Sequence, residues 1–158
     1  MNYLIDTHAH LDFPELYSKL DLIIENAKNQ NVLKIITIST NLNKIGKIIQ
    51  ISNDYDVVYF TVGVHPNEVL KDKDYENYSL ISDISNNLKC VGIGECGLDY
   101  HFGNEDKEKQ KLSFITQIKV ARDTGLPLII HSRDADKDMI NILQDEYKKG
   151  AFKAILHC

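Results

Sequence analysis

The segment "LIDTHAHLDF", residues 4–13, decides between two folds for this chain. It begins as a short apolar strand and ends in polar residues that include His8 and His10. A doubly wound nucleotide-binding sheet usually has a glycine-rich phosphate loop after its first strand, whereas this segment contains no glycine. A (β/α) barrel instead carries its chemistry at the carboxyl ends of several strands. The segment therefore favours a barrel.

Apolar segments of strand length alternate with helical segments along the rest of the chain. The expected strands are "YLIDTHAH", "VLKIITIST", "VVYFTVGVH", "KCVGIGECG", "PLIIHS" and "FKAILHC". Between them, apolar residues recur at helical spacing, and the least regular helix is expected within residues 74–88. Repeated strand–helix order predicts a parallel sheet covered by helices. We therefore expect an α/β fold, a partial (β/α)8 TIM barrel with about six of the eight strand–helix units.

Length and composition restrict the class of protein. With 158 residues and 43% hydrophobic content, residues 1–158 are expected to form a single domain, incomplete at the C-terminus because a whole barrel takes about 250 residues. No apolar run approaches the roughly 20 residues that span a bilayer, and no basic flank marks a signal peptide, so we expect a cytoplasmic protein without membrane contact. A net charge of −5 argues against a broad basic face for nucleic acid.

Histidines gather where the expected strands end. Five of the six histidines and one glutamate lie at these ends: His8 and His10, His65, Glu95, His131 and His157. Residues at i and i+2 of a strand point to one face, about 6.6 Å apart. A closed barrel brings its parallel strand ends around one mouth. Neutral imidazole and carboxylate groups that meet there predict a site for divalent metal ions.

Each of these residues has a structural interpretation as well. A histidine pair is often a surface accident, and His131 alone is as well explained by a hydrogen bond to backbone in the core. Glu95 is harder to explain so, because a carboxylate in an apolar strand is costly to bury unless it is paired or bound to metal. Arg133 is a candidate for a phosphate oxygen or a solvated charge beside Asp134. His65 is a candidate substrate contact or hydrogen-bond partner.

The blocks "IDTHAHLD", "VGVHP", "GIGECGLDY", "LPLIIHSRDA" and "ILHC" together resemble the TatD family of metal-dependent deoxyribonucleases, which are amidohydrolase-like TIM barrels. The resemblance covers essentially the whole chain in order. It implies that His8 and His10 bind a first metal, that Glu95 bridges, and that His131 and His157 bind a second. It also implies hydrolysis of DNA phosphodiester bonds by a metal-activated water, with zinc, manganese, cobalt or magnesium as the two ions.

The chain departs from the family pattern at three places. Asn67 stands where a histidine often follows "HP", and Cys96 replaces a commoner isoleucine or threonine. The family also continues past "HC" with two more strand–helix units, whose last strand supplies an aspartate to the first metal. We therefore expect a truncated barrel with exposed apolar edges, self-association through those edges and nearly no activity in isolation. Hydrolysis of another ester, amide or lactone, or an inactive metal-binding remnant, are the alternatives.

Overall fold

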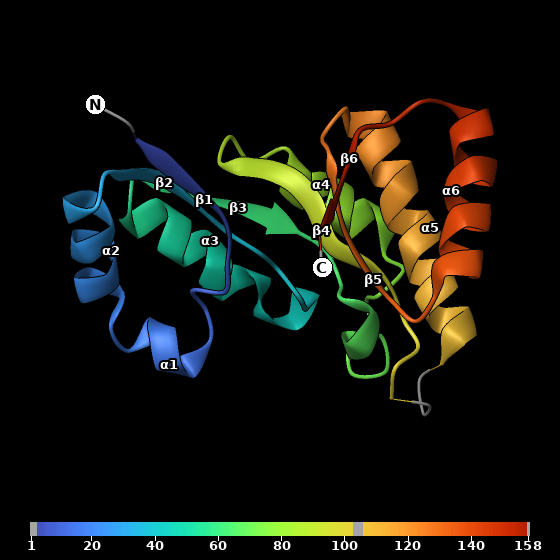
Figure 1. The fold of residues 1–158 in the computed structure, drawn as a ribbon, viewed down its shortest axis with the longest axis horizontal. Coiled ribbons are helices and arrows are strands. Elements are labelled where there is room, and N and C mark those ends of the chain that lie inside the picture. Colours follow the sequence, from blue (N-terminus) through green and yellow to red (C-terminus); the bar gives the residue numbers. More distant parts are fainter. Residues whose placement is uncertain (1–2, 103–105, 158) are drawn as a thin grey trace.

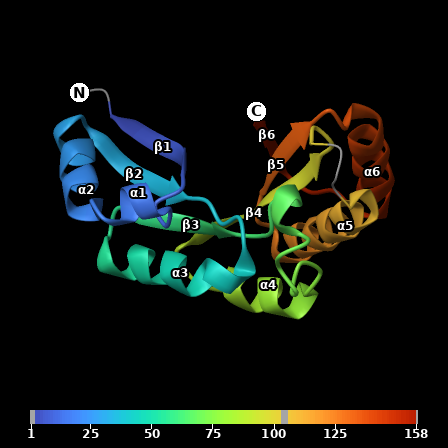
Figure 2. The ribbon, with the colours of Figure 1, turned by 90° about the horizontal axis from the view of Figure 1, so that it is seen from below.

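The computed structural model describes residues 3–102 and 106–157, which form one curled, six-stranded parallel sheet. The strands lie side by side in chain order: β1 (Leu4–Ala9), β2 (Val32–Thr37), β3 (Val58–Val62), β4 (Cys90–Asp99), β5 (Leu128–Arg133) and β6 (Ala154–His157). Figure 1 shows this arrangement, and Figure 2 shows that the sheet curves into an arc with β1 and β6 on either side of an opening. The predicted partial (β/α) barrel is confirmed.

Helices follow the strands and cover the convex side of the arc (Figure 2). They are α1 (Pro14–Tyr17), α2 (Leu20–Asn29), α3 (Ile45–Asp54), α4 (Tyr78–Ser85), α5 (Lys107–Thr124) and α6 (Asp136–Lys149), with 3-10 turns η1 (Leu42–Lys44) and η2 (Pro66–Glu68). The irregular helix expected within residues 74–88 is α4, and the Asn77 side chain accepts a hydrogen bond from the Leu80 backbone N–H at its start. Within the described residues, no helix is both long and apolar enough to cross a bilayer.

The core lies between the central strands and the helices outside them. In β4 every residue except Val91 is buried, and the neighbouring parts of β3 and β5 are nearly as enclosed. Phe60 of β3 and Phe114 of α5 are fully buried in this core. Such near-continuous burial is typical of parallel strands covered on both faces. The central strands therefore form a buried, well-packed part of the sheet, which fixes the position of the site residues at their carboxyl ends.

The two edge strands are much more open. Leu4 and Ile5 of β1 are 61% and 56% exposed, and Ile155 and Leu156 of β6 are 54% and 65% exposed. Among the described residues β1 pairs only with β2, and β6 only with β5. Exposed apolar edges were expected from an open barrel, because such strands keep free hydrogen-bonding groups and uncovered side chains.

Several strand ends differ from the prediction by a few residues, and the end of the third strand matters most for the site. The third strand was expected to run to His65, but β3 ends at Val62. His65 is instead the N-cap of η2, with Pro66 at its first position. Proline has a fixed φ and no N–H to donate to a sheet, so it starts the turn and ends the strand pattern before it. His65 consequently lies on a loop at the open end of the sheet.

Candidate metal centre

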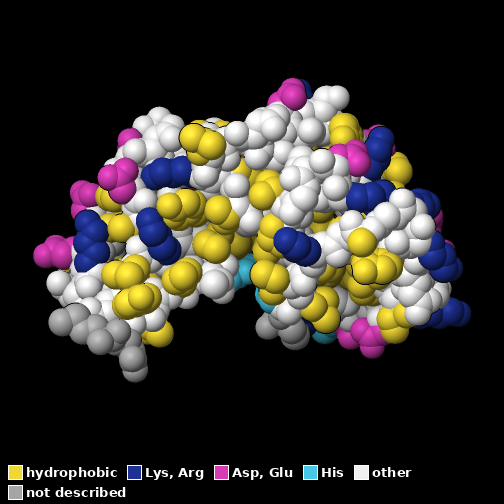
Figure 3. All heavy atoms as spheres, turned by 90° about the horizontal axis from the view of Figure 1, so that it is seen from above, with side chains coloured by type: hydrophobic (Ala, Val, Ile, Leu, Met, Phe, Trp, Pro, Cys, Tyr) yellow, Lys and Arg dark blue, Asp and Glu magenta, His cyan; other side chains and the backbone are white. Residues whose placement is uncertain are grey.

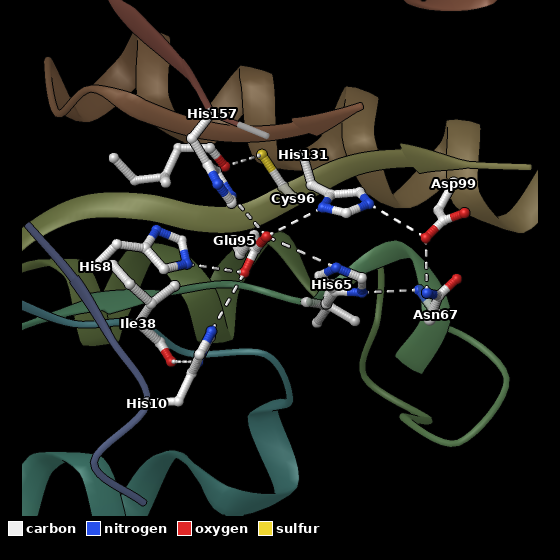
Figure 4. A network of polar contacts seen from close by, with 12 residues as sticks. His8, His10, Ile38, His65, Asn67, Glu95, Cys96, Asp99, His131 and His157 are labelled. Atoms are coloured by element: carbon white, nitrogen blue, oxygen red, sulfur yellow. Dashed lines mark hydrogen bonds and ion pairs between the residues drawn. The ribbon is translucent and has the colours of Figure 1, made fainter. Parts of the chain in front are cut away.

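Glu95 stands at the centre of the site because β4 passes very close to β5. Gly94 and Gly97 have φ values of +134° and +129°, a conformation that L side chains rarely adopt. A Cβ atom on these glycines would collide with the carbonyl oxygens of Ile129 and His131, respectively. The glycines noticed in the sequence thus permit this close approach, and Glu95, only 3% exposed, points toward the histidines (Figure 4).

Five histidine rings surround the Glu95 carboxylate, and its two oxygens face different rings (Figure 4). Oε2 lies 3.4 Å from Nε2 of His8 and 3.8 Å from Nε2 of His10. Oε1 lies 2.7 Å from Nε2 of His157, 3.3 Å from Nδ1 of His131 and 3.7 Å from Nε2 of His65. The structure therefore brings together all the histidines that the sequence placed at strand ends, from β1, β5, β6 and the loop after β3.

These side chains line a cavity of about 310 Å³ at the open end of the sheet. Its wall also includes Phe13, Thr40 and Glu68. In the space-filling view of Figure 3, histidine side chains lie at the surface of the hollow between the two ends of the molecule. Phe13 stacks on the His10 ring, with centroids 4.8 Å apart and planes at 15°. The site is therefore reachable from solvent and is mostly polar at its base.

The donor atoms are close enough to share cations. One group consists of His8, His10 and Glu95, and a second of His65, Glu95 and His131; within each group the ligand atoms lie within 4.8 Å of one another. Imidazole nitrogen and carboxylate oxygen are ligands for zinc and other first-row divalent metals. A carboxylate shared by both groups can bridge two cations, one held by each group. By donor chemistry and spacing, the residues present fit divalent metal ions.

The surroundings keep Glu95 ionised. Burial alone raises the pKa of this carboxyl group, but hydrogen bonds from His131 and His157 outweigh burial and lower the pKa to about 2. A carboxylate with such a pKa holds no proton at neutral pH. Its chemistry is therefore that of an anionic ligand, and it is a poor proton donor or acceptor.

The histidine pKa values move in different directions. Burial lowers the pKa of His65 to about 4 and outweighs the opposing effect of Glu95. Burial also lowers the pKa of His8, which lies in the same cavity. The hydrogen bond to Glu95 raises the pKa of His131, assisted by Asp99. Neutral imidazole is the metal-binding form, so burial favours binding at His8.

Sequence reasoning missed a second carboxylate that supports the site. Asp99, at the end of β4, is 2% exposed, and its Oδ2 lies 3.2 Å from Nε2 of His131. The same oxygen accepts a hydrogen bond from the Asn67 side-chain amide at 2.9 Å, while Oδ1 accepts from the His101 backbone N–H at 3.0 Å. A signal was present, because Asp99 lies four residues after Glu95 in "GECGLDY", within the block that was singled out.

Two buried glutamines of α5 form hydrogen bonds to the end of β4 and to the loop that carries His65. Gln110 exchanges two hydrogen bonds with the backbone of Asp99, at 2.9 and 3.0 Å. Gln117 does the same with the backbone of Val64, at 3.0 and 3.1 Å. Both glutamines are fully buried, seven residues apart and so on one face of the helix. They couple α5 to the end of β4 and to the loop that carries His65.

Arg133, the predicted phosphate contact, lies at the rim and not among the residues that line the cavity. It is exposed, and its guanidinium carbon lies 5.5 Å from the centre of the Phe102 ring. Nearby, His101 Nδ1 lies 2.8 Å from an Asp134 oxygen, so the sixth histidine faces away from Glu95 toward a partner of its own. A substrate-binding role for Arg133 stays a prediction.

Cys96 and Asp6 make structural contacts. Cys96 is fully buried, its thiol approaches the Ile129 carbonyl at 3.5 Å, and burial raises its pKa. Asp6 Oδ1 accepts a hydrogen bond from the His8 backbone N–H at 3.1 Å, a local contact within β1. Strand alternation explains the place of Cys96, because the neighbour of an inward-facing residue such as Glu95 points the other way.

Comparisons with known proteins agree on one family. The profile described as "TatD related DNase" matches residues 5–158. The chain belongs to the TatD-related DNase family. It is 37% identical over 155 residues to the uncharacterized metal-dependent hydrolase YabD of Bacillus subtilis and 36% identical over 166 residues to the human deoxyribonuclease TATDN3. In each case 98% of this chain aligns with 60% of the relative.

Solved structures of TatD homologues share the fold. The crystal structure of YJJV from Escherichia coli superposes with a TM-score of 0.83 at 28% identity, covering 90% of this chain and 56% of that one. The TatD family hydrolase from Entamoeba histolytica gives the same TM-score and identity, covering 99% of this chain and 58% of that one. This TatD-family chain thus spans about 60% of the length of the curated relatives that it matches.

Proposed function

We propose that this TatD-family chain is the site-bearing part of a divalent-metal-dependent hydrolase that cleaves phosphodiester bonds in DNA. One observation carries the proposal: a single buried carboxylate, Glu95, faces one set of histidines with each of its two oxygens. That arrangement suits two cations that share a bridging ligand. The name of the human relative, a deoxyribonuclease, supports DNA as the substrate class.

The proposed metal ligands form two sets, one beside each carboxylate oxygen of Glu95. His8 and His10 hold one ion beside Oε2, and His131 and His157 hold the other beside Oε1. When bound, divalent ions supply a nucleophile from water at neutral pH and neutralise charge on phosphoryl oxygens. Glu95 contributes as the ionised bridge, the one catalytic carboxylate of the proposal, because its pKa of about 2 leaves no proton to transfer. Buried β4 holds this bridge in place.

His65 and Arg133 are the proposed substrate contacts. His65 lies at the base of the cavity, and the lowered pKa keeps its ring neutral at pH 7, so it can donate one hydrogen bond to a phosphate oxygen. Arg133 lies farther out, beside the exposed ring of Phe102. A guanidinium there suits a phosphate of the strand beyond the scissile bond. The net charge of −5 fits short or terminal stretches of DNA better than long duplexes.

The remaining sequence predictions keep that status. Histidine-rich ligation suits zinc, manganese or cobalt, and the family resemblance also allows magnesium. Residues 1–158 as one incomplete domain, a cytoplasmic location, self-association through β1 and β6, and weak activity of the isolated chain all stay predictions. Analytical ultracentrifugation of the 158-residue chain tests the self-association, which would appear as a sedimentation coefficient that rises with protein concentration.

A substrate panel tests the proposed function. The chain is stripped with chelator, reloaded with manganese or zinc, and incubated with an end-labelled single-stranded oligonucleotide, a lactone and a phosphotriester. We expect slow metal-dependent cleavage of the oligonucleotide, because the isolated chain is expected to be nearly inactive, and a fall to the metal-free background in Glu95→Gln because the bridge is gone. Glu146→Gln is the matched control, since Glu146 is similarly buried but its ion-pair partners are Arg122 and Lys149 and not the histidines of the cavity.

Each outcome discriminates. Cleavage of the lactone or phosphotriester without the oligonucleotide would replace DNA with another substrate class. Metal binding without hydrolysis of any substrate would leave the chain as a binding remnant. Equal loss of activity in Glu95→Gln and Glu146→Gln would show that the effect is one of folding and would remove the support for a bridging role.

A further inference from the structure

The histidines around Glu95 differ in which ring nitrogen carries a proton, and their other contacts reveal it. A neutral imidazole has one N–H donor and one acceptor lone pair. A backbone N–H can only donate, whereas a carbonyl or an ionised carboxylate can only accept. We call the ring nitrogen nearer Glu95 the inner nitrogen and the other one the outer nitrogen. In a neutral ring, the group bound to the outer nitrogen therefore determines whether the inner nitrogen presents an N–H or a lone pair to the site.

His131 offers a lone pair. Its outer nitrogen, Nε2, lies 3.2 Å from the Asp99 carboxylate, which can only accept a hydrogen bond, so this nitrogen carries the proton and donates it in that bond. In the neutral ring its inner nitrogen, Nδ1, 3.3 Å from Glu95 Oε1, then carries the lone pair that a cation would take, whereas without a cation this nitrogen can hold a proton and donate it to Glu95 in the hydrogen bond described above. His10 is arranged to the same effect, because its Nδ1 faces the Ile38 carbonyl at 3.2 Å and its Nε2 faces Glu95.

His65 offers the opposite. Its Nδ1 accepts a hydrogen bond from the Asn67 backbone N–H at 3.1 Å, so this nitrogen carries the lone pair. The proton of the neutral ring is therefore on Nε2, the nitrogen that points at Glu95 Oε1 across 3.7 Å. His65 and His131 are neighbours, with ring centroids 4.5 Å apart, and both are protonated on Nε2. The two rings differ in which nitrogen faces Glu95: His65 presents Nε2–H, whereas neutral His131 presents the lone pair of Nδ1.

We propose that Asp99 and Asn67 are positioning residues that assign these two histidines different roles. His131 is a metal ligand through Nδ1, whereas His65 does not bind metal and donates Nε2–H to an anionic oxygen in the site. The inference deepens the proposed function and rests on its metal site. Proximity alone does not make this distinction, because a nitrogen of His65 and a nitrogen of His131 both lie within 4.8 Å of a Glu95 oxygen.

Asn67 links the two histidines physically. Its backbone N–H binds His65, and its side-chain amide donates to Asp99 Oδ2 at 2.9 Å, beside the contact to His131 (Figure 4). Both oxygens of Asp99 are accepting, since Oδ1 binds the His101 N–H. An asparagine at position 99 has one accepting oxygen only, so either the His101 N–H or the pair His131 and Asn67 loses its acceptor.

The first experiment reads the protonation directly. Histidine side chains of the 158-residue chain are labelled with ¹⁵N, the chain is loaded with diamagnetic zinc, and long-range ¹H–¹⁵N spectra are recorded. We expect His131 to show a metal-bound Nδ1 and a protonated Nε2. His65 is expected to show a protonated Nε2 and an Nδ1 free of metal. Assignment uses the single variants His65→Gln and His131→Gln.

The second experiment measures zinc affinity by competition with a chromogenic chelator. His131→Gln is expected to weaken binding of one zinc ion by at least about 100-fold, and Asp99→Asn by about 10- to 100-fold, the usual cost of losing an outer partner. His65→Gln is expected to leave both zinc affinities unchanged within error. Asp134→Asn is the matched control, because Asp134 is also a carboxylate bound to a histidine, His101, outside the cavity.

The outcomes separate this inference from the proposed function. Zinc-shifted nitrogen signals on His65, or equal loss of zinc in His65→Gln and His131→Gln, would overturn the division of roles. Wild-type affinity in Asp99→Asn, with folding verified by circular dichroism, would overturn the positioning role. A wild-type chain that binds no zinc would remove the metal site and both proposals. Correct protonation and affinities without DNA cleavage would contradict the proposed function alone.

Discussion

The central strands and the edge strands both carry site residues, yet they hold them differently. Glu95 and Asp99 lie in β4, which is buried along almost its whole length. His8 and His157 lie in β1 and β6, where most side chains are exposed. Figure 2 shows the two edge strands facing one another across the opening of the arc. The most buried strand and the two most exposed strands of the sheet thus contribute residues to the same site.

Hydrogen bonding shows the same contrast. The outer nitrogen of His131 has the Asp99 carboxylate as its partner, that carboxylate accepts two further hydrogen bonds, and the Asp99 backbone is held by Gln110. Among the described residues, the side chains of His8 and His157 contact Glu95 and each other, with ring centroids 4.1 Å apart, and form no outer hydrogen bond. The central part of the site is therefore preorganised before a ligand arrives, whereas the edge part depends on what Glu95 and a ligand provide.

The largest expected effect compares two residues that face each other across β5 and β6. Ile130 and Leu156 are register partners, but Ile130 is 1% exposed and Leu156 is 65% exposed. Ile130→Ala is expected to lower the free energy of unfolding by about 2 to 5 kcal/mol, through lost burial and a cavity. Leu156→Ala is expected to change it by no more than about 0.5 kcal/mol. Urea unfolding of the 158-residue chain measures both.

This pair also tests the idea of an open edge. If Leu156→Ala destabilised the chain as much as Ile130→Ala does, β6 would be covered in solution, for example by a second copy. A concentration-dependent midpoint for the wild type would then identify self-association as the cause. Equal stability losses at all protein concentrations would contradict the contrast between the central strands and the edge.

A smaller effect concerns pH and the buried part of the site. Burial lowers the pKa of His65 to about 4, whereas an unfolded histidine titrates near 6.5. Between these values the unfolded chain binds a proton that the folded chain does not, so the free energy of unfolding increases as pH rises from 4 to 6.5. For metal-free protein, His65 should make folding about 2 kcal/mol less favourable at pH 4.5 than at pH 7.

The variant His65→Gln isolates this contribution, because glutamine does not titrate. The lowered pKa of His8 acts in the same direction and the raised pKa of His131 in the opposite one, and both remain in the variant. Unfolding in urea with chelator at the two pH values should give a smaller pH difference for His65→Gln than for wild type. An unchanged difference in His65→Gln would show that His65 is not buried as described.

The sequence was sufficient for the fold and for the inventory of inward-facing groups, for physical reasons. Strand and helix periods were regular, and parallel topology forces strand ends to one side, so the histidines of separate segments had to meet. The supporting residues could not be predicted in this way. Asp99 and Gln110 meet because of where α5 packs on β4, a tertiary relation without a local pattern. The end of β3 was missed because "VGVH" continues the strand pattern after the strand has turned away.

The smallest expected effect compares the helices that cover the two parts of the sheet. In α5, which packs on β4, the Asp106 side chain accepts a hydrogen bond from the Lys109 backbone N–H at 3.0 Å and caps the helix. In α2, which packs beside β2, Lys19 stands at the same position without a side-chain cap. Asp106→Ala should therefore lower the free energy of unfolding by about 1 kcal/mol, and Lys19→Ala by no more than a few tenths. Equal effects in urea unfolding would mean that capping does not distinguish the two helices, and that α5 owes its stability to Gln110, Gln117 and the apolar face alone.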